Sequence, residues 1–336
     1  MGPMFTVPSS KTAFGIFLIF ATGVMAGYGL SVFLDQSEQS EVNQTSKQIR
    51  QVGEYRYTNP LLECEVAVDI ITARKENFDA ALEDFVAETK KKHQLSDVAV
   101  YFRDLNNGPT FGTSEEDEFF PASLLKVPVM MAYYRWSEVE PGLLGRKILY
   151  EAPVDFGVSV AIKSRVELVL GQEYSLEQLI EQMIVYSDNQ ALYLLVQRLP
   201  QEKVIDLFRM LGVGEDVVKN TQARLTVKEY AGFFRILFNS SYLSQENSEK
   251  ALELLTRTDY HDALPGPLPK EVVVAHKFGE AGTGEADRQL HDCGIVYFPD
   301  HPYLACIMTR GKKTDGLKDS IQDISKFIYD KIDEQY

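Results

Sequence analysis

The sequence has few cysteines and few histidines, and this scarcity argues against a structural metal site. Cys64, Cys293 and Cys306 are the three cysteines among 336 residues. None belongs to a C-x-x-C pair or lies near two histidines at ligand spacing, which are the patterns of protein zinc sites. Cys293 and Cys306 flank an expected hairpin turn at Pro299–Pro302. The expected register does not place them opposite each other, so we expect buried free thiols.

The sequence also has fewer basic than acidic residues. The 34 lysines and arginines are outnumbered by 49 aspartates and glutamates, which gives a formal net charge of −15. A protein that binds nucleic acid needs a basic surface for the phosphates, so this balance argues against a nucleic-acid partner. Hydrophobic residues make up 45% of the chain. That is enough for a sizeable core in one large domain or two smaller ones, and it is compatible with a soluble enzyme.

Charge is absent altogether from Ala13 to Leu34, a run of 22 residues that Lys11 precedes and Asp35 follows. A run of this length spans a bilayer, and the flanking charges place the N-terminus inside the cell. We therefore predict a cytoplasmic stub and a membrane anchor over 1–34. The alternative is a signal peptide cleaved near Ala26, which would give a secreted protein. Both interpretations place the rest of the chain outside the cytoplasm.

The remainder of the chain divides into a polar segment and a folded domain. Residues 35–60 are rich in Gln, Ser and Glu and poor in apolar residues, which predicts a flexible tether. The folded domain is expected over 61–336. Within it, 137–256 is expected to be mostly helical and to form a separate helical lobe.

Hydrophobic periodicity predicts the order of helices and strands. Helices are expected over 76–92 and 122–136, and a final amphipathic helix carries Leu317 to Ile332. The five expected strands are 97–105, 109–114, 271–279, 294–298 and 302–309. This order predicts an α+β fold, with a five-stranded antiparallel sheet flanked by the N- and C-terminal helices. The helical lobe is inserted between the second and third strands, and a cleft is expected between lobe and sheet.

Two helices of the predicted lobe have clear start signals. Ser175 followed by Gln178 is a capping-box pattern, and the apolar residues that follow keep a helical period to Leu199. Thr226 precedes another amphipathic stretch and is the expected cap of a helix there.

The first candidate for chemistry is Ser123 with Lys126, which interrupts an otherwise apolar helix. Residues at i and i+3 are neighbours on a helix. A lysine half-buried among Leu124, Leu125 and Val127 has its charged form disfavoured, and a neutral amine can take the serine proton. The alternative is a capping serine and a lysine that reaches solvent with its ammonium group.

The second and third candidates are Ser187-Asp188-Asn189 and Lys277-Phe-Gly279. A polar triplet in an apolar stretch is costly unless its groups are paired, so the triplet is either a buried network or a helix break, or it relays a proton and holds a substrate carbonyl. Lys277 ends an expected strand, where its cation can meet a substrate carboxylate, and Gly279 leaves room for a ligand along the strand edge. The alternative is an ordinary strand-end lysine and a turn glycine. His276, beside Lys277, is a weaker candidate for lining the cleft.

Taken together, these motifs resemble those of a known family. Ser-x-x-Lys, Ser-Asp-Asn and Lys-x-Gly in this order are typical of class A β-lactamases and penicillin-binding proteins. Over residues 76–334 the chain is similar to the penicillin-recognising serine hydrolases, and most similar to class A β-lactamases. The resemblance implies that Ser123 is the acylated nucleophile and that Lys126 is its base. It implies that Ser187 and Asn189 are the functional groups of the middle motif, and that Lys277 is the cation on the strand. It also implies an oxyanion hole formed by the backbone N–H groups of Ser123 and Glu280, and it implies no cofactor and no metal.

Two departures from the family pattern bear on function. Phe278 stands where the family has Thr or Ser, so a hydroxyl that helps to hold a substrate carboxylate is missing. The Glu-x-x-Leu-Asn stretch that supplies the deacylating base of class A β-lactamases is also missing, and Glu215 or Asp216 is only a weak substitute. The acyl-enzyme is therefore expected to be long-lived toward β-lactams.

The sequence thus predicts a membrane-anchored, extracytoplasmic serine hydrolase that is acylated at Ser123 by β-lactams or peptide amides. The alternatives are a D-alanyl-D-alanine carboxypeptidase-like penicillin-binding peptidase, and a sensor that binds β-lactams or wall fragments without turnover. The expected partners are a small-molecule β-lactam or a peptidoglycan stem peptide, and the membrane through the N-terminal helix.

Overall fold

The computed structural model describes residues 55–59, 71–106, 110–157, 161–215, 217, 220, 223–282 and 287–335. All of them fall within one of the two units into which the chain divides. The predicted membrane anchor over 1–34 and Cys64 lie outside the described residues. Among the helices that are described, none has the length and apolarity to cross a membrane.

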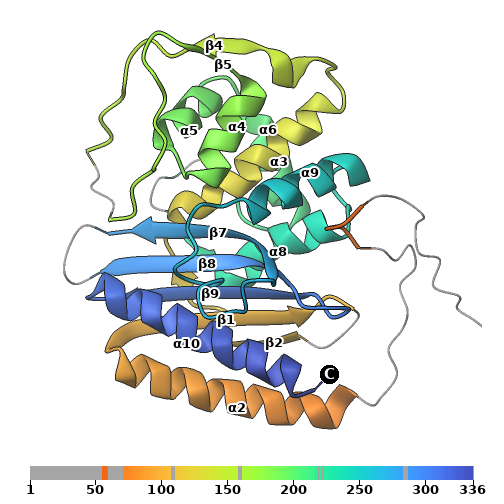
Figure 1. The fold of residues 1–336 in the computed structure, drawn as a ribbon, viewed down its shortest axis with the longest axis vertical. Coiled ribbons are helices and arrows are strands. Elements are labelled where there is room, and N and C mark those ends of the chain that lie inside the picture. The colour runs from red at the N-terminus through yellow and green to blue at the C-terminus, as the bar shows by residue number, and fades with distance from the viewer. Residues whose placement is uncertain are drawn as a thin grey trace, which may run out of the picture. The chain divides into compact units, whose positions relative to one another are not determined.

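The predicted five-stranded antiparallel sheet is confirmed, with the strand order β2-β1-β9-β8-β7 (Figure 1). The strands are β1 (Leu95–Asp104), β2 (Thr110–Thr113), β7 (Val273–Ala281), β8 (Arg288–Tyr297) and β9 (Tyr303–Gly311). Chain neighbours pair as hairpins, and β1 from the start of the domain pairs with β9 near its end. Strand β7 is left at one edge of the sheet, so its outer backbone edge is free to face other groups.

The two terminal helices cover one face of the sheet, as predicted. They are α2 (Ile71–Lys92) and α10 (Thr314–Asp333), and they lie in front of the sheet in Figure 1. The apolar stripe of α10, Leu317, Ile321, Ile324 and Ile328, is fully buried against the sheet. A stripe with helical period that packs on one sheet face explains why this element is legible in the sequence.

The helices of the inserted lobe pack against the other face and above the edge strand β7 (Figure 1). They are α3 (Lys126–Ser137), α4 (Leu176–Val185), α5 (Asn189–Val196), α6 (Gln201–Met210), α8 (Val227–Phe238) and α9 (Gln245–Thr256). The expected caps are confirmed, because Ser175 and Thr226 each form a complete capping box. The lobe is less helical than predicted, since its described residues between 147 and 175 contain a small hairpin, β4 (Lys147–Leu149) with β5 (Glu173–Ser175).

The helical period from Ser175 to Leu199 is divided between two helices, and the helix break was one of the alternatives that the Ser187-Asp188-Asn189 triplet left open. Helix α4 ends at Val185 and α5 begins at Asn189. Between them Ser187 has a φ of 55°, in the left-handed region, and Asp188 caps α5 by accepting a hydrogen bond from Ala191 N at 2.7 Å. The apolar period continues across the break because both helices bury the same side, so the pattern alone conceals it.

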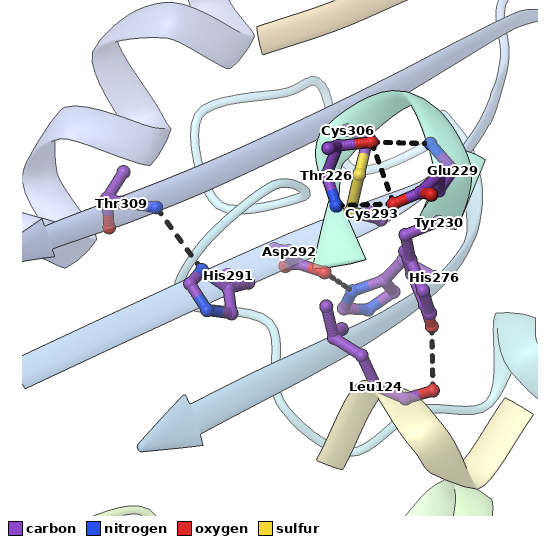
Figure 2. The surroundings of a disulfide bond; sticks show 10 residues. All are labelled: Leu124, Thr226, Glu229, Tyr230, His276, His291, Asp292, Cys293, Cys306 and Thr309. Carbon is purple, nitrogen blue, oxygen red and sulfur yellow. Dashed lines mark hydrogen bonds and ion pairs between the residues drawn. A yellow bond between two sulfur atoms is a disulfide. The ribbon is translucent and has the colours of Figure 1, made fainter. Parts of the chain in front are cut away.

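The expectation of free thiols at Cys293 and Cys306 is also wrong. The two residues are directly opposite in the β8–β9 hairpin and form a disulfide, which Figure 2 shows. The expected register fails because it centres the turn on Pro299–Pro302, whereas the observed pair Val296 and Tyr303 centres it one residue earlier. A small change in the centre of a hairpin turn changes every facing pair along both strands.

The last residues of the predicted tether pack on the folded domain. Glu249 on α9 accepts hydrogen bonds from the backbone N–H groups of Arg56, Tyr57 and Thr58. Asn59 N donates to Phe238 O at 2.7 Å. A single carboxylate therefore holds three successive amides of this segment.

Candidate active site

Ser123 lies in a tight turn before α3. The helix expected over 122–136 begins as a 3-10 turn, η1 (Ala122–Leu125), and continues as α3. Ala122 has a φ of 49°, a left-handed conformation that costs a residue with a Cβ about 1–2 kcal/mol. Such strain persists only where the surroundings impose it, and it is frequent at functional sites. The first N–H groups of a helix have no partner within the helix, so the amide of Ser123 is suited to bind an oxyanion.

Lys126 begins α3 one turn after Ser123 and is buried, with 1% of its surface exposed. Its Nζ lies 3.0 Å from Ser123 Oγ and 3.0 Å from Ser187 Oγ. It also donates to two carbonyl oxygens, Ser187 O at 2.6 Å and Asn189 Oδ1 at 2.8 Å. The structure therefore brings Ser123, Lys126, Ser187 and Asn189 together, as the sequence motifs predict.

The contacts of Lys126 indicate which way the Ser123 proton moves. Carbonyl oxygens can only accept, so Ser187 O and Asn189 Oδ1 take two N–H groups of the amine. A neutral amine then keeps its lone pair for a hydroxyl, and Ser123 Oγ–H is a suitable donor. Burial lowers the pKa of Lys126 to about 7, against the opposing effect of the nearby Asp188 carboxylate. Lys126 can thus act as a base near neutral pH.

Ser187 is placed by the break between α4 and α5. Its hydroxyl lies 3.0 Å from Lys126 Nζ and 3.0 Å from Lys277 Nζ, so one oxygen bridges the two amines. The left-handed backbone of Ser187 lets both its carbonyl and its hydroxyl reach Lys126. Ser187 is therefore positioned to pass a proton between the two lysines and a group bound beside them.

Lys277 reaches this bridge from β7 and is fully buried. Besides Ser187 Oγ, its Nζ donates to Phe278 O at 3.1 Å. Burial, and next the proximity of Lys126, lower the pKa of Lys277 well below its usual value. Two buried amines around one hydroxyl repel each other when both are charged, so the neutral form of at least one is favoured.

Gly279 allows β7 to approach the turn that carries Ser123. A Cβ at this position would lie 2.9 Å from Leu124 Cγ and 3.0 Å from Pro121 O. We predicted that Gly279 leaves room for a ligand, but the close neighbour is the protein's own turn η1. Glu280 follows directly, and its side chain points to another segment, where its carboxylate accepts hydrogen bonds from Ala161 N and Ile162 N at 3.0 Å. The oxyanion role of its backbone N–H stays a prediction.

His276 does not line the cleft, contrary to the weaker sequence hypothesis. It is almost completely buried, with 1% of its surface exposed. Its Nδ1 lies 2.8 Å from Asp292 Oδ1, and Asp292 Oδ2 accepts a hydrogen bond from Leu264 N (Figure 2). This buried pair holds the segment before β7 against the sheet.

Sequence reasoning missed two groups that shape the site, Tyr230 and Tyr260. Tyr230 on α8 donates to Leu124 O at 3.0 Å and so fixes the nucleophile turn (Figure 2). Asp188, which belongs to the second candidate motif, places its charge near Lys126. Tyr260 packs on Phe278, with ring centroids 4.4 Å apart. No motif marks Tyr230 or Tyr260, because only the folded chain brings them to the site.

The weak substitutes for a deacylating base gain no support. Glu215 Oε1 accepts a hydrogen bond from Arg209 Nη2 at 2.8 Å, at the C-terminal end of α6. Asp216 lies outside the described residues. The contacts of Glu215 therefore explain its position by an ion pair with the preceding helix α6.

Comparison with known proteins identifies relatives of this fold and site. The model of the beta-lactamase enzyme family matches residues 77–332, about three quarters of the chain. A search of curated proteins gives no match.

Solved structures with the same fold include both β-lactamases and a penicillin-binding protein. A mutant of PBP-A, solved as an acyl-enzyme complex with penicillin G, is 19% identical with a TM-score of 0.63, and the match covers 76% of this chain and 97% of that one. The β-lactamase of Sphaerobacter thermophilus is 22% identical with a TM-score of 0.61, covering 74% and 94%. TLA-3 extended-spectrum β-lactamase is 18% identical with a TM-score of 0.66, covering 76% and 99%. At these identities the likeness shows the fold.

Proposed function

The chain belongs to the beta-lactamase enzyme family, and from this premise we propose that it is a serine hydrolase that is acylated at Ser123 by an amide or lactam. The observation that carries the proposal is the placement of Lys126. Its buried Nζ lies 3.0 Å from Ser123 Oγ, with two N–H groups already committed to carbonyl oxygens. A solvent-exposed lysine or a capping serine would need none of these contacts.

Residues that the structure describes can carry out each proton transfer of the proposed acylation. Ser123 Oγ attacks the carbonyl carbon while its proton passes to Lys126 Nζ. The negative charge that develops on the carbonyl oxygen is held by the backbone N–H groups of Ser123 and Glu280. When the C–N bond breaks, Ser187 Oγ–H protonates the departing nitrogen, and Ser187 recovers a proton from Lys126. Lys277 stabilises the Ser187 oxygen from the other side, and Asn189 Nδ2 donates to the substrate.

The lifetime of the acyl-enzyme decides between the alternative activities. Glu215, one of the two weak candidates for a deacylating carboxylate, is paired with Arg209. This pairing favours a penicillin-binding peptidase with slow deacylation of β-lactams over an efficient β-lactamase. A sensor that is acylated once without turnover is the further alternative.

We propose that the domain works outside the cytoplasm, held by the apolar run over 13–34. The Cys293–Cys306 disulfide supports this location, because disulfides persist in oxidising compartments and are rare in the cytosol. In that location a peptidoglycan stem peptide is the proposed natural partner. Cleavage of the run as a signal peptide would give a secreted form with the same active site.

Intact-protein mass spectrometry tests the proposal. The full chain is mixed with a fluorophosphonate, which labels activated serines, and in parallel with benzylpenicillin. We expect a covalent adduct on the wild type and none on Ser123→Ala, and we expect Lys126→Ala to slow labelling at least about 100-fold, the usual contribution of a general base. A stable penicillin adduct supports the slow-deacylation peptidase, and Ser123-dependent loss of the drug without an adduct supports a β-lactamase. Absence of Ser123-dependent labelling by either reagent would sink the proposal.

A further inference from the structure

Lys277, the cation expected to meet a substrate carboxylate, is covered by other groups of the protein. Lys277 is fully buried, and its Nζ donates to Ser187 Oγ and Phe278 O. The ring centroid of Phe278 lies 4.0 Å from the same Nζ. Burial also lowers the pKa of Lys277, so the charge that would attract an anion is itself disfavoured. This lysine is arranged to serve Ser187 rather than to meet an incoming carboxylate.

Phe278 and Tyr260 together form an apolar wall beside Lys277. Phe278 is 5% exposed and packs against the partly exposed Tyr260, with the ring planes at 45°. A phenyl ring has no donor to replace the water that solvates a carboxylate. Bringing a charged group against this wall therefore costs free energy that no contact there returns.

The groups around the wall carry mostly negative charge. Burial is the main cause that raises the pKa of the Tyr260 hydroxyl. The carboxylates of Asp292, Asp262 and Glu280 raise it further, so all three lie close enough to Tyr260 to act on it electrostatically. Arg165, an exposed cation on the segment that contacts Glu280, has its Nε 3.3 Å from Asp259 Oδ2. A further anion beside the wall would be repelled.

The wall lies beside the lysine that contacts Ser187 Oγ. In the proposed mechanism Ser187 Oγ protonates the departing nitrogen, and Phe278 borders the lysine that contacts that oxygen. In the last residue of a peptide, and in penicillins, a free carboxylate is attached to the carbon bonded to the departing nitrogen. In an internal residue the same carbon carries an uncharged amide.

We propose that the site acts on acyl substrates whose departing group carries no free carboxylate, and that Phe278, aided by Glu280, is the specificity determinant that excludes one. This rests on the proposed acylation of Ser123 and names its substrate class. An internal peptide bond meets the requirement, because the amide that follows it is uncharged. A carboxypeptidase substrate does not.

Benzylpenicillin and its methyl ester form a matched pair of probes, because they differ only in that carboxylate. The second-order rate of Ser123 acylation is measured for each on the full chain by intact mass. We expect the ester to react at least about tenfold faster than the acid. An acid that reacts as fast as the ester or faster overturns the inference. The inference is also overturned if the ester leaves Ser123 unmodified while the fluorophosphonate labels it. In both cases the proposal that the protein is a serine hydrolase still stands.

Two variants assign the preference to its residues. In Phe278→Thr we expect the ester-to-acid ratio to fall at least about tenfold, since the substitution removes the ring and adds a donor. In Glu280→Gln the side chain keeps its shape and can still accept from Ala161 N and Ile162 N. Loss of its charge should lower the ratio about fivefold, the scale of one nearby charge.

Controls separate this effect from a general loss of structure. The rate of fluorophosphonate labelling is measured for every variant, and each acylation rate is divided by it. Glu271→Gln removes an exposed charge just before the opposite end of β7 and should leave the ratio unchanged. If both Glu280→Gln and Phe278→Thr are labelled normally and keep the wild-type ester-to-acid ratio, the assignment of the preference to these two residues is overturned. Failure of labelling in the wild type would instead refute the proposed function itself.

Discussion

Two buried lysines that share one serine hydroxyl define the chemistry at the scale of single residues. Lys126 and Lys277 approach Ser187 Oγ from different elements, each at 3.0 Å. Burial works against a charge on either of them. Asp188, which is also buried and caps α5, is the carboxylate that favours the charged form of Lys126. The balance between burial and this carboxylate sets the pH at which the base is available.

The rate of Ser123 acylation is therefore predicted to rise with pH, with a midpoint near 7, as Lys126 loses its proton. In Asp188→Asn the midpoint should move to lower pH, because removal of a nearby negative charge makes the ammonium less stable. Asparagine caps helices as well as aspartate does, so α5 should persist. Fluorophosphonate labelling rates between pH 5 and 9 measure both midpoints, and an unchanged or higher midpoint in the variant would contradict this account.

At the scale of elements, the site depends on the contact between the edge strand β7 and the turn η1. Gly279 lies against Pro121 O and Leu124, while Tyr230 on α8 holds Leu124 O from the other side. Ser123 is one residue before Leu124, so its position follows from these contacts. A strand, a 3-10 turn and a helix from three parts of the chain thus fix one hydroxyl.

Gly279→Ala is predicted to slow acylation at least about tenfold and to destabilise the fold by about 1–3 kcal/mol, the usual cost of overpacking. The added Cβ would lie 3.0 Å from Pro121 O, a backbone atom that cannot move aside as a side chain does. Gly145→Ala is the matched control, because a Cβ there has no neighbour within 4 Å. Thermal unfolding and labelling rates should be near wild type for the control, and an equally mild effect in Gly279→Ala would refute the proposed contact.

At the scale of the whole domain, two apolar cores lie on opposite faces of one sheet. The core under α2 and α10 contains Ile307 and Ile321, and the core under the helical lobe contains Cys293 and Cys306. The disulfide joins β8 to the central strand β9 on the lobe side. It therefore joins the strand next to β7 to the centre of the sheet.

Removal of this disulfide is predicted to lower the free energy of unfolding by about 3 kcal/mol, the magnitude for a loop of this size in the chain-entropy model. The Cys293→Ala/Cys306→Ala double variant should unfold at lower temperature, with acylation of Ser123 retained below that temperature. Thiol titration of the unreduced, unfolded chain should detect Cys64 alone of the three cysteines. Detection of all three thiols in protein purified from an oxidising compartment would show that the disulfide does not form.

Much of the fold was predictable because its signals are local. The stripe of α10, the caps Ser175 and Thr226, and the strand patterns each depend on residues within a few positions of one another. The candidate residues Ser123, Lys126, Ser187, Asn189 and Lys277 were also found in the sequence, since the motifs have fixed spacing. The disulfide was mispredicted, because the centre of a turn is not marked by its prolines. The break at Ser187 stayed one of several alternatives, because an apolar period can cross a helix break.

The sequence by itself thus determined which side chains carry chemistry and which elements present them. Only the tertiary structure decided what those side chains can do. The distances of 3.0 Å from Ser187 Oγ to Lys126 and to Lys277, and the burial of both lysines, arise from segments far apart in the chain. Burial and proximity set the pKa of an amine and the access of an anion, and neither quantity exists until distant segments have packed together.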